Sequence, residues 1–130
     1  MRTTLFYALA LLVSAGCSSS KYRIVEPTPQ LSLSTVAAVC ELGQAVSLTL
    51  AVSQEGIDGN FSLSAFIREG QAAITLDGSD MDTSGQWVQL ADRNARLVIT
   101  PAQTGDLLVS FQAKSPDGGI SGQQDLKVTV

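Results

Sequence analysis

Few side chains in this sequence could take part in catalysis. The 130 residues include no histidine, so the commonest general base and a principal zinc ligand are both missing. No serine stands in a G-x-S-x-G turn, which positions the nucleophile of many hydrolases. Two cysteines remain, Cys17 and Cys40, and no histidine is available to activate either thiol. We therefore predict a protein that is not an enzyme and that needs no cofactor.

An acidic loop offers a set of oxygen ligands. The stretch DGSDMDTSG contains three aspartates, Asp77, Asp80 and Asp82. Read from Asp80, the order D-x-D-x-S-G is typical of the start of a calcium loop, in which alternate oxygens converge on the cation. The twelfth position, where such loops place a bidentate glutamate, is Ala91. The sequence favours a solvated turn whose aspartates accept hydrogen bonds from its own amides, with calcium binding as the alternative.

The single tryptophan, Trp87, follows this loop. An exposed tryptophan beside polar groups could stack on a sugar ring, which would make the protein a glycan-binding module. A tryptophan that opens an alternating run, here WVQL, more often anchors a core, because burial removes a large apolar area from water. We predict that its ring is buried near the core residues Leu48, Leu97 or Val109. A buried ring favours a structural or protein-interaction role, and an exposed one favours ligand binding.

Cys17 stands at the end of an apolar amino-terminal run. Arg2 precedes the apolar residues LFYALALLV, and small residues follow, which is the layout of a secretory signal peptide. The run is too short to span a bilayer, which needs about 20 apolar residues. The sequence Ser14-Ala15-Gly16-Cys17 resembles a bacterial lipobox, with serine where leucine is usual. The resemblance implies cleavage before Cys17 and lipidation of its thiol.

The alternative is ordinary signal cleavage after the small-residue sequence VSA, residues 13–15. Cys17 would then be free, and a disulfide with Cys40 could form in an oxidising compartment. If Cys17 is lipidated, Cys40 is an unpaired thiol, which we expect to serve as a small apolar residue of the core.

The segment SSSKYRIVEPTPQ after Cys17 mixes serines, charges and prolines without an apolar period, and it predicts a flexible tether. A serine after the lipidated cysteine resembles the outer-membrane sorting of proteobacteria, which implies an outer-membrane lipoprotein that faces the periplasm. The expected division of the chain is a signal peptide at 1–16, the lipidated cysteine and tether at 17–30, and a single domain at 31–130.

The charge of the chain argues against a nucleic-acid partner. The formal net charge is −4 at pH 7, and loss of Arg2 with the leader makes the mature chain more negative. Nucleic-acid-binding domains cluster Lys and Arg on one face, whereas here these residues are scattered along the sequence. The partners that we expect are the membrane, through the lipid, and a protein of the envelope; the oligomeric state is left open.

The mature chain alternates apolar and polar residues with a period of two, as in strands with one buried face. The clearest run is AVSLTLAV, in which the apolar positions are Val46, Leu48, Leu50 and Val52. The pattern recurs in FSLSAFI, AITL, WVQL, RLVIT, LLVSFQA and DLKVTV, and LSLSTVAAV is the expected first strand. Stretches rich in Gly, Asp, Asn and Pro separate these runs. Seven or eight short strands at this spacing predict an all-β, antiparallel sandwich.

The stretch RLVITPAQTGDLLVSFQA resembles the corner between strands E and F of immunoglobulin-like domains. Thr100 and Pro101 end one alternating run, and Gly105 leads into the next. Leu107 stands where the corner tyrosine of the family is expected. The resemblance implies an immunoglobulin-like sandwich.

The lipobox-like leader, LGQAVSLTL, FIREGQAAITLDG and SPDGGISG together resemble the small lipoproteins of the TraQ type that conjugative elements of Bacteroidetes encode. The resemblance spans most of the mature chain and implies an accessory role in the cell envelope. Our hypothesis is a non-enzymatic, membrane-anchored lipoprotein with a structural or protein-interaction role, accessory to a conjugative transfer apparatus. The alternative is a β-sandwich module that binds glycan or calcium.

Overall fold

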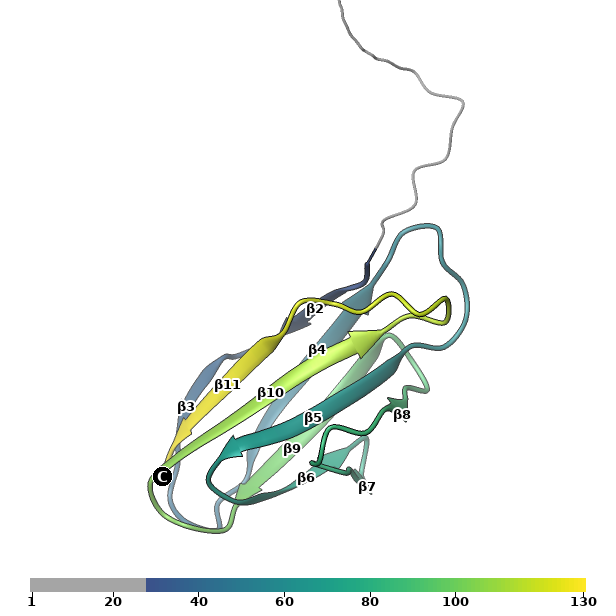
Figure 1. Ribbon diagram of the computed structural model, residues 1–130. Coiled ribbons are helices and arrows are strands. Elements are labelled where there is room, and N and C mark those ends of the chain that lie inside the picture. Colours follow the sequence, from purple (N-terminus) through teal and green to yellow (C-terminus); the bar gives the residue numbers. More distant parts are fainter. Residues whose placement is uncertain (1–27) are drawn as a thin grey trace, which may run out of the picture.

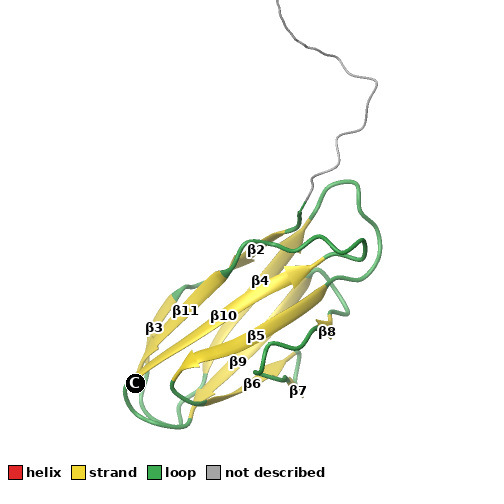
Figure 2. Ribbon diagram, viewed as in Figure 1, coloured by secondary structure: helices red, strands yellow, loops and turns green. Residues whose placement is uncertain are grey.

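The computed structural model describes residues 28–130, which form two five-stranded sheets packed face to face (Figures 1 and 2). Every regular element of this part of the chain is a strand, and none of its segments is a helix that could cross a membrane. The predicted all-β class is confirmed. Cys17 and the predicted signal peptide lie outside the described residues.

Each sheet has a long strand pair at its centre. The first, which we call the β10 sheet, has the order β3 (Ala37–Val39), β11 (Gln124–Thr129), β10 (Asp106–Lys114), β5 (Ser62–Glu69) and β8 (Val88–Gln89). The second, the β9 sheet, has the order β2 (Gln30–Leu33), β4 (Val46–Ser53), β9 (Asn94–Pro101), β6 (Ala72–Leu76) and β7 (Ser79–Asp80). All neighbours are antiparallel except β3, which runs parallel to β11. This is the arrangement of an immunoglobulin-like sandwich, as predicted.

The core lies between the two sheets and is built from the alternating residues that the period of two singles out. Those on β4, β9 and β10 are almost completely buried: Leu48, Leu50, Val52, Leu97, Ile99, Leu107, Val109, Phe111 and Ala113. Burial of one large apolar side chain stabilises a fold by about 1.5–3 kcal/mol, so this layer holds the sheets together.

The expected first strand, residues 31–39, is divided between the two sheets. At the end of β2, the Ser34 amide donates a hydrogen bond to the Thr49 carbonyl (2.8 Å), which keeps this part on the β9 sheet. The chain then crosses over, and the Lys127 amide donates to the Val36 carbonyl (3.0 Å) on the β10 sheet. The prediction of one continuous strand was wrong. The alternation indicates which side chains are buried, but it does not indicate in which sheet the strand forms its hydrogen bonds.

Two connections fix the remaining geometry. The turn from β9 to β10 passes from one sheet to the other, as the resemblance to an E–F corner implied, and Leu107 at the corner is buried. A further hairpin joins β6 to β7, and both its central residues, Asp77 (φ 49°) and Gly78 (φ 88°), have left-handed backbones. This type I′ geometry suits an Asp-Gly pair. The divided first strand and the short β7 raise the number of strands above the predicted seven or eight.

Candidate interaction surface

The acidic loop is a turn held by its own hydrogen bonds. The Asp77 carboxylate accepts a hydrogen bond from the Arg96 amide (2.9 Å), which ties the hairpin to β9. The Asp82 carboxylate accepts one from the Ser84 hydroxyl and another from the Ser84 amide (2.7 Å). These two bonds, the hydroxyl's first, lower the pKa of Asp82. Asp82 thus caps an amide of its own loop, as the turn interpretation predicts, whereas Asp77 caps an amide of β9.

The same loop offers no gathered set of cation ligands. Asp80 lies exposed on β7, and Met81 beside it is buried in the core. Within residues 28–130, no three Asp, Glu, His or Cys side chains form a group that could hold a metal ion. The arrangement therefore lends the calcium hypothesis no support.

Cys40 follows β3 at the edge of the β10 sheet. Its thiol is free and half-buried, and its side chain packs against the core. The Cys40 amide donates to the Thr129 carbonyl (3.1 Å), which extends the pairing of β3 with β11. The residue thus lies at the border of the core, where we expected a position inside it.

Trp87 is not a core residue, and that prediction was wrong. Its side chain is 37% exposed. The reason is the register of β8, in which Val88 pairs with Leu63 of β5. Val88 and the buried Leu90 turn inward, so the alternation sends Trp87 and Gln89 outward. In WVQL, the side chains that face the core are therefore those of Val88 and Leu90.

Trp87 lies near a second exposed ring on the outer face of the β10 sheet. Phe66 of β5 is 50% exposed. The register of β5 and β8 places Trp87 level with Ser64, two residues from Phe66 on the same side of β5. That separation is about 7 Å along a strand. The loop before Trp87 is fixed here as well, because Ser84 forms a β-bridge with Phe66.

A cation accompanies the two rings. The Lys114 ammonium, at the end of β10, lies 5.2 Å from the centroid of the Trp87 ring, within the range of a cation–π contact. Lys114 forms no ion pair with any carboxylate of residues 28–130. We call Phe66, Trp87 and Lys114 the aromatic face.

A hydrogen-bonded group borders the aromatic face. The Ser110 hydroxyl donates to the Asp125 carboxylate (2.7 Å) and accepts a bond from the Arg68 guanidinium (3.4 Å). Arg68 also lies 3.7 Å from the second oxygen of Asp125. The pKa of Asp125 is lowered, chiefly by the Ser110 hydroxyl and to a smaller extent by the Gln123 side chain and Arg68. Arg68 is therefore engaged within the protein, in contrast to Lys114.

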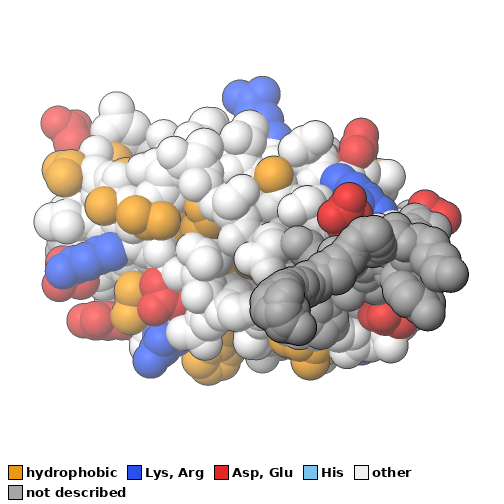
Figure 3. Space-filling model, turned by 90° about the horizontal axis from the view of Figure 1, so that it is seen from above, with side chains coloured by type: hydrophobic (Ala, Val, Ile, Leu, Met, Phe, Trp, Pro, Cys, Tyr) orange, Lys and Arg blue, Asp and Glu red, His pale blue; other side chains and the backbone are white. Residues whose placement is uncertain are grey.

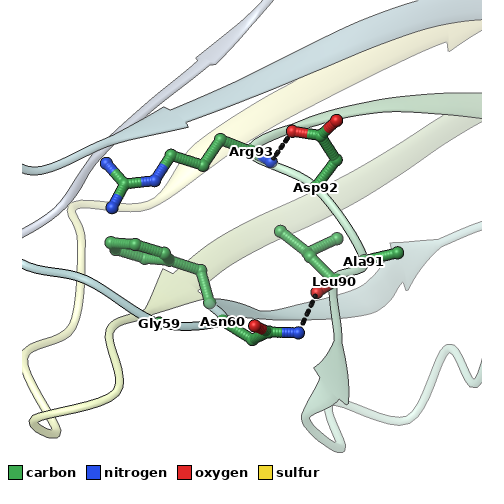
Figure 4. A pocket seen from close by; sticks show the side chains of 7 residues that line it. Gly59, Asn60, Leu90, Ala91, Asp92 and Arg93 are labelled. Atoms are coloured by element: carbon green, nitrogen blue, oxygen red, sulfur yellow. Dashed lines mark hydrogen bonds between the residues drawn. The ribbon is translucent and has the colours of Figure 1, made fainter.

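The hollow at Phe61 is lined by side chains that bond within the protein (Figure 4). The Arg93 guanidinium lies 4.7 Å from the centroid of the Phe61 ring and donates to the Ile57 carbonyl. On the other side of the hollow, the side-chain amide of Asn60 donates a hydrogen bond to the Leu90 carbonyl (3.3 Å). These contacts fasten the β4–β5 loop to the sandwich, and we assign the hollow no ligand.

Three other exposed apolar side chains lie at or beside the β3 edge, namely Val36, Val39 and Leu42, and a fourth, Ile120, forms a β-bridge with Lys114. In Figure 3, the view from above, hydrophobic side chains form only a short row among polar and charged ones. The free edge itself is partly closed, since the Thr35 hydroxyl donates to the Ala37 carbonyl (2.8 Å) and the Glu41 amide donates to the Gln44 side chain (3.1 Å). Such caps hinder the addition of a foreign strand.

Sequence reasoning missed Phe66 and Lys114. In FSLSAFI, Phe66 occupies the alternate set that otherwise holds Ser62 and Ser64. A large aromatic residue among the alternate positions that are otherwise serine could have indicated an exposed ring. Lys114 could not be found in this way, because only the fold brings it to Trp87.

Solved structures place the fold among bacterial lipoproteins. A conjugative transposon lipoprotein from Bacteroides eggerthii matches with a TM-score of 0.69 and 14% identity, over 81% of this chain and 100% of that one. A lipoprotein from Bacteroides thetaiotaomicron matches with a TM-score of 0.66 and 15% identity, over 91% and 87% of the two chains. These proteins share its fold.

A conjugate transposon protein from Bacteroides vulgatus gives a TM-score of 0.65 at 16% identity, over 86% of this chain and 92% of that one. The fibronectin(III)-like modules of Clostridium thermocellum CbhA match less well, with a TM-score of 0.50 at 16% identity, over 82% of this chain and 47% of theirs. No protein-family model matches the chain, and no curated protein matches it. The sequence resemblance to lipoproteins of conjugative elements is thus matched by likeness of fold.

Proposed function

We propose that this protein is a non-enzymatic, lipid-anchored lipoprotein of the bacterial cell envelope that binds another protein as an accessory of a conjugative transfer apparatus. The observation that carries the proposal is the likeness of its sandwich, over most of each chain, to three proteins of Bacteroides, of which two are lipoproteins and two are proteins of conjugative transposons. The lipobox-like leader that ends at Cys17 supports the anchor independently. The absence of histidine supports a role in binding.

The proposed anchor determines which end of the domain is joined to the membrane. On this proposal residues 1–16 are removed, Cys17 carries the lipid in the outer membrane, and the domain is in the periplasm. Gln30, the first residue of β2, pairs with Ser53 at the end of β4, so the chain enters the domain beside the β4–β5 loop (Figure 1). The ten residues from 18 to 27 span at most about 35 Å when fully extended. The chain therefore enters the domain within about 35 Å of the lipid anchor, at the end with the β4–β5 loop.

The anchor is tested with the Cys17→Ser variant in cells fed labelled palmitate. We expect Cys17→Ser to lose the label and to leave the membrane fraction, because its hydroxyl cannot form the lipid thioether. Cys40→Ser is the matched control and should keep both the label and the membrane association. Membrane association of Cys17→Ser equal to that of the unchanged protein would contradict the proposal. A Cys17–Cys40 disulfide in the mature protein would show ordinary cleavage instead.

A glycan-binding module is the second candidate, and the exposure of Trp87 beside Phe66 favours it. Sugar rings stack on exposed aromatic side chains, and polar groups around them fix the orientation. Titration of the protein with soluble peptidoglycan fragments and with neutral oligosaccharides, followed by tryptophan fluorescence, tests this candidate directly, because Trp87 is the sole tryptophan.

A further inference from the structure

We propose that the aromatic face binds an acidic segment of a partner protein that also carries an exposed apolar side chain. The inference deepens the proposed protein-interaction role and rests on it. It names the surface, which is the outer side of β5, β8 and β10, and the chemistry of the partner.

The distribution of charge points to an acidic partner. Residues 28–130 contain five Lys and Arg residues and eleven Asp and Glu residues, so the domain as a whole is acidic. Three of the five cations nevertheless lie on the outer face of the β10 sheet, namely Arg68, Lys114 and Lys127. An interface gains specificity when a local patch meets the opposite charge.

Within this group, Lys114 is the cation that a partner can use. Arg68 is engaged with Asp125 (3.7 Å), and Lys127 is paired with Asp106 (3.8 Å). The Asp82 carboxylate, in the loop beside Phe66, accepts hydrogen bonds from Ser84. Lys114 lies on the Trp87 ring instead, which orients its ammonium without neutralising it.

The surface around Lys114 suits an apolar anchor. The outward serines of the neighbouring strands, Ser64 and Ser110, are each only 7% exposed. Neighbouring side chains therefore cover the serines, and the exposed apolar area here is that of Phe66 and Trp87, on which an apolar side chain can lie. Aromatic side chains of this kind supply much of the binding energy at protein interfaces.

The structure favours a protein segment over a sugar. A sugar site combines stacking rings with a concave polar wall. The hollow at Phe61 and the one lined by Leu76, Asp80 and Gln89 do not include Trp87 or Phe66. The polar groups next to the rings, Ser110 and Asp125, already bond to each other.

The test is a titration of the purified full-length protein in non-ionic detergent with a short synthetic peptide that contains leucine and glutamate separated by serines, and no tryptophan. The fluorescence of Trp87 reports binding at the proposed surface. A second peptide carries glutamine in place of every glutamate, and a neutral oligosaccharide serves as the sugar probe. Lys114→Glu is compared with Arg96→Glu, which makes the same change of charge on β9 of the other sheet.

We expect the acidic peptide to shift the Trp87 spectrum in a saturable way and the glutamine peptide to bind more weakly. Lys114→Glu should weaken binding at least about tenfold and Arg96→Glu less than about threefold, because only the first places a like charge at the contact. Anisotropy of a labelled acidic peptide should show a comparable loss for Phe66→Ala, with circular dichroism as the check of folding.

Equal weakening by the two charge variants would overturn the proposal, since net charge alone would then explain binding. Absence of saturable binding to the acidic peptide would overturn it, and so would a response to the oligosaccharide alone, which would assign the surface to glycans. A spectrum that changes with protein concentration would assign it to a second copy of the chain. Each of these results leaves the lipid anchor unaffected, because Cys17→Ser tests the anchor separately.

Discussion

The two faces of β10 differ in what they contribute to the protein. The inward side chains, Leu107, Val109, Phe111 and Ala113, are at most 1% exposed and pack against the β9 sheet. The outward ones are Leu108, Ser110, Gln112 and Lys114, of which Ser110 forms hydrogen bonds and Lys114 a cation–π contact. The inward face provides the apolar burial that holds the sandwich together, whereas the outward face is under less constraint from packing and can carry recognition.

The largest effect that this comparison predicts is at the inward ring of β10. Phe111→Ala should lower the free energy of unfolding by about 3–5 kcal/mol, because it removes a fully buried aromatic side chain and leaves a cavity. Urea unfolding followed by circular dichroism measures the change. The neighbour Gln112→Ala, on the outward face, is the control and should change stability by less than about 0.5 kcal/mol. Similar losses for both variants would mean that the two faces do not divide their roles in this way.

A second test concerns a glycine that packs against the start of β10. Gly70 has a φ of +85°, and a Cβ there would lie 2.9 Å from the Asp106 carbonyl oxygen and 3.2 Å from the Leu107 Cα. Gly43 also has a positive φ, +80°, but a Cβ there would meet nothing within 4 Å. Gly43→Ala should cost about 1–2 kcal/mol for the left-handed backbone alone.

Gly70→Ala should cost clearly more than Gly43→Ala, since the backbone of β10 must also move. Thermal unfolding of the two variants side by side measures the difference. Equal melting temperatures would show that the β5–β6 turn can shift without disturbing β10.

The third prediction concerns the outward tryptophan. Trp87→Ala should lower the free energy of unfolding by about 1–2 kcal/mol, because only part of its apolar area is removed from water. The same urea experiment measures it. A loss as large as that of Phe111→Ala would mean that Trp87 holds the sandwich together as firmly as the core does.

The centre of each sheet could be predicted from the sequence, because a strand between two others buries one complete face. Leu48 alternates with the polar residues Ser47 and Thr49 for that reason, and it is buried as predicted. Leu97, in the run RLVIT, is buried as well. The corner before Leu107 could also be predicted from the sequence, because it joins two alternating runs.

The edges could not be predicted in the same way. β8 has two residues and one neighbour, so its short apolar run does not decide which residues face inward, and Trp87 was placed on the wrong side. The sequences of β2 and β3 form one apparent run, although the chain passes from the β9 sheet to the β10 sheet after Ser34. The aromatic face combines side chains from β5, from the residue before β8 and from β10. Phe66 stands out within its own strand, but no local pattern shows that Trp87 and Lys114 lie beside it.

The smallest predicted effect is at Ser110, on the outward face of β10. Its hydroxyl is the main cause of the lowered pKa of Asp125, whose ordinary value is 3.8. Ser110→Ala should therefore raise the pKa of Asp125 towards that value. A carboxyl with a lowered pKa in the folded state stabilises the protein above its unfolded pKa, and this contribution is lost as the pH falls through the folded pKa. Ser110→Ala should accordingly flatten the dependence of stability on pH below about 4.

Titration of the carboxyl groups by NMR measures this change, and Asp117 provides an internal control. The pKa of Asp117 is also lowered, but chiefly by the Ser115 hydroxyl, so Ser110→Ala should leave it where it is. A rise at Asp125 alone would show that the outward hydrogen bonds of β10 act locally. An unchanged Asp125 would instead identify Arg68 or Gln123 as the main cause. A rise at both carboxyls would mean that Ser110→Ala disturbs the structure as far as the β10–β11 loop, which holds Asp117.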